Sequence, residues 1–230
     1  MVVLDDFRRA FYRCLTGWGD ALFAKGGIDS DRLRAVLVAQ RPADWPAVCA
    51  VDASTWARCD AETSPERGFY YTAAKHPAGQ PIVAGWSYQW ITQLGWAANS
   101  WTAPVDALRI PPTTDTTTAT IDQLRRLVGL LGDDGPVPMF VFDAGYDPIA
   151  LTHELADTRA QVLVWHGARF ALADDATWTA PDAELVTDDA RYGTVKVTAW
   201  SALHPKLHGR GRWRGHDEPP IVRGTVIRVA

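Results

Sequence analysis

The sequence predicts a mixed α/β fold, and three observations support this prediction. After Pro46 the chain carries short apolar runs separated by turn residues, which is typical of strands. The runs at 47–51, 68–75 and 81–91 predict three successive strands, and HPAGQ between the last two suits a hairpin loop. Further along, helical and strand-like segments alternate. This order predicts a sheet that contains both antiparallel and parallel strands.

The later elements follow from their residue spacing. In TTATIDQLRRLVGLL (117–131), apolar residues recur at helical intervals, and Gly132 is expected to end that helix. The run VPMFVFD predicts a strand that delivers Asp143 to its tip. Pro148 is expected to begin a short helix behind Asp147 as its cap, and QVLVW (161–165) predicts a buried strand.

The predicted elements divide the chain into three parts. Residues 1–45 form a helical preface, with one helix at 5–24 and a second capped by Ser30, whose apolar residues are Leu33, Val36 and Leu37. Residues 46–168 form the core, and 169–230 read as a β-rich extension that is turn-rich at 171–185 and strand-like at 193–200 and 220–229. The core order is strand, strand, strand, helix, strand, helix, strand. This is the order of the ribonuclease H-like fold, in which the first and fourth strands lie parallel and adjacent.

Composition limits the possible functions. The net charge of -4 gives no overall signature of nucleic-acid binding, so contact with a polyanion would need local basic patches. Most of the 11 tryptophans are expected to serve packing. The N-terminus carries acids where a signal peptide is positive, and no apolar run is long enough to span a bilayer. These features, with three scattered cysteines, predict a soluble cytoplasmic protein without a membrane partner.

Two aspartates are the candidate catalytic residues. Asp52 ends AVCAVD and Asp143 ends MFVFD, both after strongly apolar runs. Each by itself could cap a turn or a helix, but at neighbouring strand ends the two carboxylates would converge. Converging carboxylates repel each other unless they share a proton or bind a cation. Oxygen ligands favour Mg²⁺ or Mn²⁺, which can promote phosphodiester displacement.

These residues carry a family resemblance. The segment VDASTWARCDAETSPERGFYYTAAKHPAGQPIVAGWSYQWI, with VFDAGYD downstream, resembles DDE-type transposases of bacterial insertion sequences, in particular a family of high-GC actinobacteria. The resemblance implies that Asp52 and Asp143 are the first two catalytic acids and that both hold metal ions. It also implies that DNA, as transposon ends and target, is the partner and that a DNA strand is cut and transferred. Whether the chain forms a homo-oligomer stays open.

The third acid expected from the resemblance is missing. It would be a glutamate on a helix that follows a β-rich insertion, whereas this chain ends at Ala230 inside what resembles that insertion. Glu154, Glu184 and Glu218 do not have the expected position. Glu62 and Glu66 are nearer to the first acid but read as loop residues. The resemblance therefore implies a truncated copy with impaired activity, or an inactive remnant that only binds DNA or a full-length transposase.

Basic residues in two regions are candidate DNA contacts. They are Arg58, Arg67 and Lys75 near the first acid, and Lys206, Arg210, Arg212 and Arg214 around Trp213. A solvated loop explains the second group equally well, and its histidines lack the carboxylate or cysteine spacing of a zinc site. A haloacid dehalogenase-type phosphatase normally has a second Asp where Ser54 stands, and an actin-like ATPase needs glycine-rich phosphate loops that this sequence lacks.

Overall fold

The computed structural model describes residues 30–71, 82–96, 101–165, 180–201, 203–205, 207 and 213–230. The chain divides into two compact units, 1–165 and 166–230, and each is described by itself. The helix predicted at 5–24 and the hairpin loop predicted at 76–80 lie outside the described residues.

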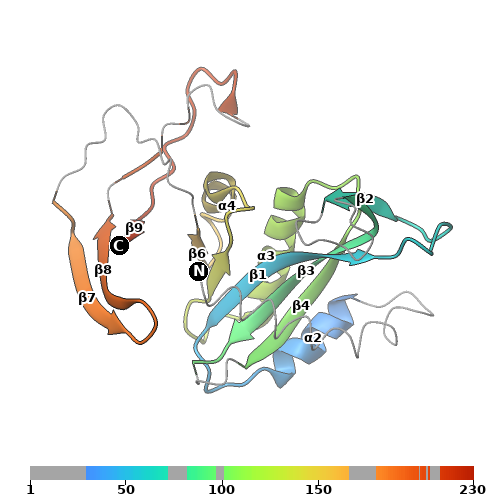
Figure 1. Ribbon diagram of the computed structural model, residues 1–230, viewed down its shortest axis with the longest axis horizontal. Coiled ribbons are helices and arrows are strands. Elements are labelled where there is room, and N and C mark those ends of the chain that lie inside the picture. The colour runs from blue at the N-terminus through green and yellow to red at the C-terminus, as the bar shows by residue number, and fades with distance from the viewer. Residues whose placement is uncertain are drawn as a thin grey trace. The chain divides into compact units, whose positions relative to one another are not determined.

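Unit 1 is built on a mixed six-stranded sheet (Figure 1). Its strands are β1 (Val48–Ala57), β2 (Gly68–Tyr71), β3 (Ile82–Leu94), β4 (Thr102–Ile110), β5 (Met139–Phe142) and β6 (Gln161–Val164). The order is β2-β3-β1-β5-β6, and β4 pairs with β3. Strands β1 to β4 pair antiparallel, whereas β5 lies parallel to both β1 and β6. The predicted mixed α/β class is therefore confirmed, and the sheet is compatible with a ribonuclease H-like fold.

Strand β4 was not predicted, because its prolines read as a connection between elements. The structure pairs it with β3 along most of its length, with a register shift between Ile91 and Thr92. Thr92 pairs with Pro104 and Ile91 with Asp106, so Val105 is the extra residue of a bulge. A bulged strand that pairs on one side tolerates a proline, because the missing N–H is not needed there.

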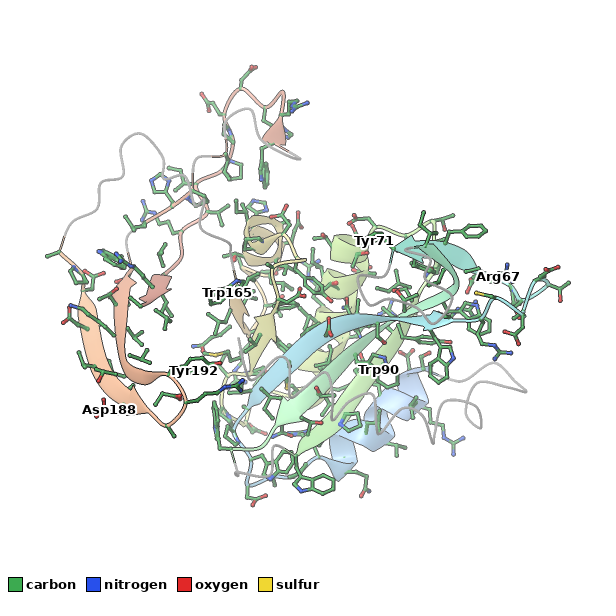
Figure 2. The ribbon with its side chains drawn as sticks, in the orientation of Figure 1. Arg67, Tyr71, Trp90, Trp165, Asp188 and Tyr192 are labelled. Atoms are coloured by element: carbon green, nitrogen blue, oxygen red, sulfur yellow. The ribbon has the colours of Figure 1, made fainter. Side chains whose placement is uncertain are left out.

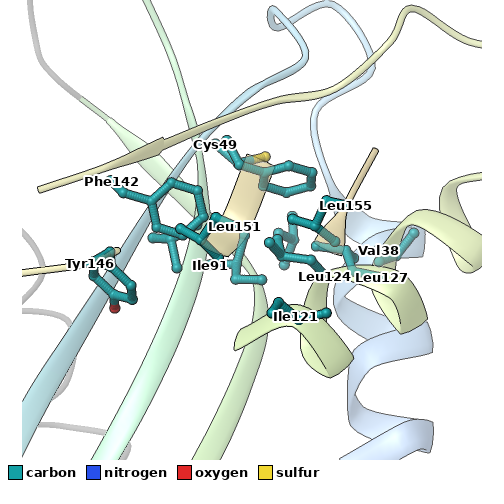
Figure 3. Packing of buried hydrophobic residues seen from close by; sticks show 13 residues of the cluster. Val38, Cys49, Ile91, Ile121, Leu124, Leu127, Phe142, Tyr146, Leu151 and Leu155 are labelled. Atoms are coloured by element: carbon teal, nitrogen blue, oxygen red, sulfur yellow. The ribbon is translucent and has the colours of Figure 1, made fainter. Parts of the chain in front are cut away.

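Three described helices pack on one face of the sheet: α2 (Ser30–Gln40), α3 (Thr116–Leu131) and α4 (Pro148–Glu154). They share one apolar cluster with β1, β3 and β5 (Figure 3). Its members are Val38, Cys49, Val51, Ile91, Val105, Ile121, Leu124, Leu127, Phe140, Phe142, Tyr146, Leu151 and Leu155. No described helix joins the smaller cluster of Ala50, Tyr88 and Trp90. Residues alternate between faces along a strand, so these three lie on the opposite face.

The helix boundaries agree closely with the predicted signals. Asp115 caps α3 by accepting a hydrogen bond from the Thr118 backbone N–H at 2.8 Å. Gly132 ends α3 with a φ of 72°, a conformation that favours glycine. Asp147 accepts hydrogen bonds from the backbone N–H groups of Ile149 and Ala150, which confirms it as the cap of α4.

The predicted apolar face of α2 is partly wrong. Val36 is 53% exposed, while Arg34 and Val38 are buried. Arg34 faces inward because Asp106 on β4 accepts a 2.7 Å hydrogen bond from its Nε. A charged residue therefore takes a position that the apolar pattern assigns to solvent.

Unit 2 contains an antiparallel sheet of β7 (Ala183–Asp189), β8 (Gly193–Trp200) and β9 (Val226–Val229), with β8 in the centre. The strand predicted at 193–200 is confirmed, and β9 covers only the end of the run 220–229. The expected turn-rich stretch 171–185 is wrong at its end, because β7 begins at Ala183. Among the described residues, no helix is both long and apolar enough to cross a membrane.

Candidate functional site

Asp52 and Asp143 are the first residues after the point where two parallel strands stop pairing. The last register pair between β1 and β5 is Val51 with Phe142, and the two aspartates directly follow it. Neighbouring strands are about 4.8 Å apart, so the two backbones are close at this point. Val51 and Phe142 both face the apolar cluster, so Asp52, the next residue of β1, faces the opposite side of the sheet.

The expected position of Asp52 at a strand tip is wrong. Strand β1 continues to Ala57 because the long strand β3 pairs with it as far as Gly85. A Cβ atom on Gly85 would lie 1.9 Å from the Trp56 carbonyl oxygen, so only glycine allows this close approach. Asp52 thus lies within an extended, paired strand. From Asp52 onward, β1 still pairs with β3 but no longer pairs with β5.

The turn after β5 orients the Asp143 carboxylate. The backbone N–H of Gly145 donates a 2.9 Å hydrogen bond to Oδ1 of Asp143. A Cβ atom at position 145 would lie 3.0 Å from the same oxygen, which is tighter than an ordinary contact. Glycine therefore lets the backbone approach Oδ1 of Asp143 closely.

Tyr146 links the aspartate pair to the protein interior. Its ring packs edge-on against Phe142 with centroids 5.0 Å apart, and its hydroxyl donates to Oε1 of Gln89 at 3.1 Å. Burial raises the pKa of the Tyr146 hydroxyl, and the negative charges of Asp52 and Asp143 raise it further. The Tyr146 hydroxyl therefore interacts electrostatically with both carboxylates. It stays protonated and can act as a hydrogen-bond donor.

A buried polar network extends from Tyr146 beneath the sheet. Gln89 is fully buried, its Oε1 lies 2.9 Å from the hydroxyl oxygen of Thr120, and its Nε2 donates to Oε1 of Gln123 at 2.8 Å. Burial raises the pKa of the nearby Asp106 carboxyl, and the Gln123 amide offsets a small part of that rise. Sequence reasoning missed these residues. The sequence signal that could have found them is Gln89, a polar residue two positions before Ile91 and therefore on the same, helix-covered face of β3.

Of the predicted DNA-contact residues, the structure describes Arg58, Arg67 and Arg214. Arg58 and Arg67 lie in the loop between β1 and β2, where Arg58 pairs with Asp60 and Arg67 Nη1 lies 3.4 Å from the carbonyl oxygens of residues 58 and 59. Arg58 is six positions past Asp52 on an extended strand, so it is about 20 Å away. Arg214 belongs to unit 2. The remaining candidates, Lys75, Lys206, Arg210 and Arg212, lie outside the described residues.

The other acids considered from the sequence have different surroundings. Glu154 ends α4 beside His153, and Glu66 forms a 3.4 Å ion pair with Arg109. Glu184 was expected in a turn-rich region but lies on β7, where it pairs with Lys196 at 2.8 Å. Within the described ranges, no three side chains of His, Cys, Asp or Glu gather as a metal site would require.

Comparison with known proteins identifies the family. No curated protein matches the chain. The family model described as DDE superfamily endonuclease matches residues 20–165, which is more than half of the chain and includes both aspartates. The chain therefore belongs to the DDE superfamily endonucleases.

Proposed function

We propose that this chain cuts and transfers DNA strands as an insertion-sequence transposase, through phosphoryl transfer that depends on a divalent metal. The observation that carries the proposal is the placement of Asp52 and Asp143 directly after the last paired residues of adjacent parallel strands. Open α/β sheets bind their ligands at the carboxyl ends of such strands. Membership of an endonuclease superfamily implies DNA as the substrate.

The two aspartates fit a hard divalent cation. Mg²⁺ keeps several water ligands and commonly binds through one or two carboxylates plus substrate phosphates. Asp52 and Asp143 supply two carboxylates, and the Gly145 N–H that binds Oδ1 of Asp143 limits the rotation of one of them. When bound, Mg²⁺ or Mn²⁺ would stabilise the negative charge that develops on the phosphate during displacement. The protein's own contribution would be to hold both carboxylates at neighbouring strands, so that one cation can reach both.

The interior beneath the pair supports this positioning. Tyr146 is held by the contact of its ring with Phe142 and by its hydrogen bond to Gln89, so the turn that carries Asp143 is anchored at both ends. Binding energy and catalysis both gain when ligands are held in place before the substrate arrives. Arg58 and Arg67, in the loop between β1 and β2, would contact DNA phosphates away from the cut.

Binding of DNA without cutting is the second candidate function. It is favoured by the finding that, in the part of the chain the structure describes, no third acidic side chain joins the pair. Two-metal sites generally need more ligands than two carboxylates. A chain with this pair alone would hold a second ion weakly and would act as a DNA-binding protein.

Removal of the metal separates the two functions. With a fluorescently labelled DNA duplex, we expect nicking in Mg²⁺ or Mn²⁺, loss of nicking in EDTA, and recovery when excess Mg²⁺ is restored. Denaturing gel electrophoresis measures the nicked strand, and a mobility-shift assay measures binding. Nicking that persists in EDTA would contradict the metal-dependent mechanism. Binding without nicking in either metal would establish the second candidate.

A further inference from the structure

Two tryptophans flank the aspartate pair in one row across the sheet. On one side, Asp52 of β1 pairs with Trp90 of β3. On the other side, β5 and β6 pair as far as Phe142 with Val164, and the backbone N–H of Trp165 donates to the Phe142 carbonyl at 3.0 Å. Trp165 is therefore the neighbour of Asp143 in the row, at a spacing of about 4.8 Å between strands.

The burial of β6 shows which face Trp165 occupies. Val162 and Val164 pack against the apolar cluster under the helices. Leu163 and Trp165 alternate with them and therefore face the side of the sheet that Asp52 also faces. They are 39% and 53% exposed, respectively, so the prediction of a buried strand at 161–165 is wrong for this face. Figure 2 labels Trp165 near β6 and Trp90 on β3.

The two tryptophans differ in what they can bind. Trp90 is 8% exposed and packs with Ala50 and Tyr88 in the smaller cluster, so it serves the packing of the sheet. Trp165 has more than half of its surface exposed next to the candidate active site. A large apolar ring left in water gains free energy when a flat partner covers it.

We propose that Trp165 stacks on an unpaired nucleobase beside the phosphodiester that Asp52 and Asp143 engage. This inference rests on the proposed function, because it requires DNA at the aspartate pair. An indole carries no charge to attract a phosphate, whereas every nucleobase offers a flat face for stacking. The neighbouring carboxylates would repel an anionic group that stacked on Trp165, whereas they would not repel an uncharged nucleobase. Stacking would hold the strand in register while the phosphate lies at the acids.

The test removes the base from the DNA and the indole from the protein in turn. Affinities of Trp165→Ala, Trp165→Phe and the unaltered protein are measured for an oligothymidine and for an abasic sugar–phosphate strand of the same length, with Ca²⁺ as the hard cation. Stacking on aromatic side chains is worth about 1–3 kcal/mol per base. Trp165→Ala is therefore expected to reduce the preference for oligothymidine by about fivefold or more. Trp165→Phe should retain most of the preference, because it keeps a stacking ring.

Trp101→Ala is the matched control. Trp101 is 62% exposed but precedes β4, whose first residue pairs with Leu94, at the end of the sheet where β1 begins. Its loss should leave the preference unchanged. An equal preference in the Trp165→Ala and unaltered proteins would overturn the proposal, as would a change of oligomeric state in Trp165→Ala with no change in preference. Thermal unfolding of each variant checks that it is folded.

The two proposals can fail separately. If DNA nicking depends on both aspartates but the base preference does not depend on Trp165, stacking is wrong and the proposed function stands. If the preference depends on Trp165 but nicking never occurs in Mg²⁺ or Mn²⁺, the DNA site is retained without the cutting activity.

Discussion

Replacing Asp143 with asparagine is expected to lower the rate of Mg²⁺-dependent DNA nicking by at least about 100-fold, and Asp52→Asn should do the same. Asparagine keeps the size of the side chain but removes the negative charge that would hold the cation. Because the two carboxylates would bind the same ion, the double variant should be little worse than either single variant. Single-turnover nicking of a labelled duplex measures the effect.

Asp147→Asn is the matched control for this loss. Asp147 lies four residues after Asp143 and caps α4 through two backbone N–H groups, a role that asparagine also fills. Its nicking rate should stay within about twofold of the unaltered protein, since Asn and Asp are comparable caps. Substantial activity in Asp143→Asn, or an equal loss in Asp147→Asn, would contradict a specific role for the pair.

Breaking the buried ion pair of Arg34 and Asp106 should cost about 3–5 kcal/mol of unfolding free energy. Both side chains are almost fully buried, at 2% and 1% exposed, and Arg34 Nε lies 2.7 Å from Oδ2 of Asp106. Asp106→Ala would leave the guanidinium buried with only the exposed Asp31 as its ionic partner. Urea unfolding followed by circular dichroism measures the loss. The paired substitution of Arg34→Met with Asp106→Leu should recover most of it, because an apolar pair needs no desolvation of charge.

The loss caused by Arg34→Met should also depend on pH. Burial raises the pKa of Asp106, and the hydrogen bond and charge of Arg34 offset part of that rise. Without Arg34 the folded-state pKa rises further above the unfolded value, so the folded protein binds the proton more tightly. The variant should then be destabilised least below the unfolded pKa and progressively more as pH rises through the folded one. A loss that is the same at low and neutral pH would contradict this account.

The parts of the fold that follow from local chemistry were predictable from the sequence. Gly132 ends α3 and Asp147 caps α4 because helix ends require particular backbone and side-chain groups. The strand that carries Asp143 was visible as an apolar run, and the pairing of β1 with β5 followed from the order of elements. This order places the backbones of Asp52 and Asp143 after the same register pair, whereas the convergence of their carboxylates stays a prediction.

The features that depend on tertiary pairing were not predictable. Strand β4 contains a proline that is tolerated because the strand is bulged and pairs on one side, and β1 continues past Asp52 because β3 pairs with it as far as Gly85. Arg34 is buried because Asp106, on a distant strand, meets it. The position of Trp165 beside Asp143 depends on the register of β6, which a single short apolar run does not specify.

Binding of Mn²⁺ tests most directly the central claim, that Asp52 and Asp143 together hold one divalent cation. Isothermal titration calorimetry of the protein without DNA should show a Mn²⁺ site. Its affinity should fall by at least about tenfold in each of the single variants Asp52→Asn and Asp143→Asn, while Asp147→Asn binds Mn²⁺ with unchanged affinity. Equal Mn²⁺ affinity in the unaltered protein and in both variants would show that the two carboxylates do not form a shared metal site.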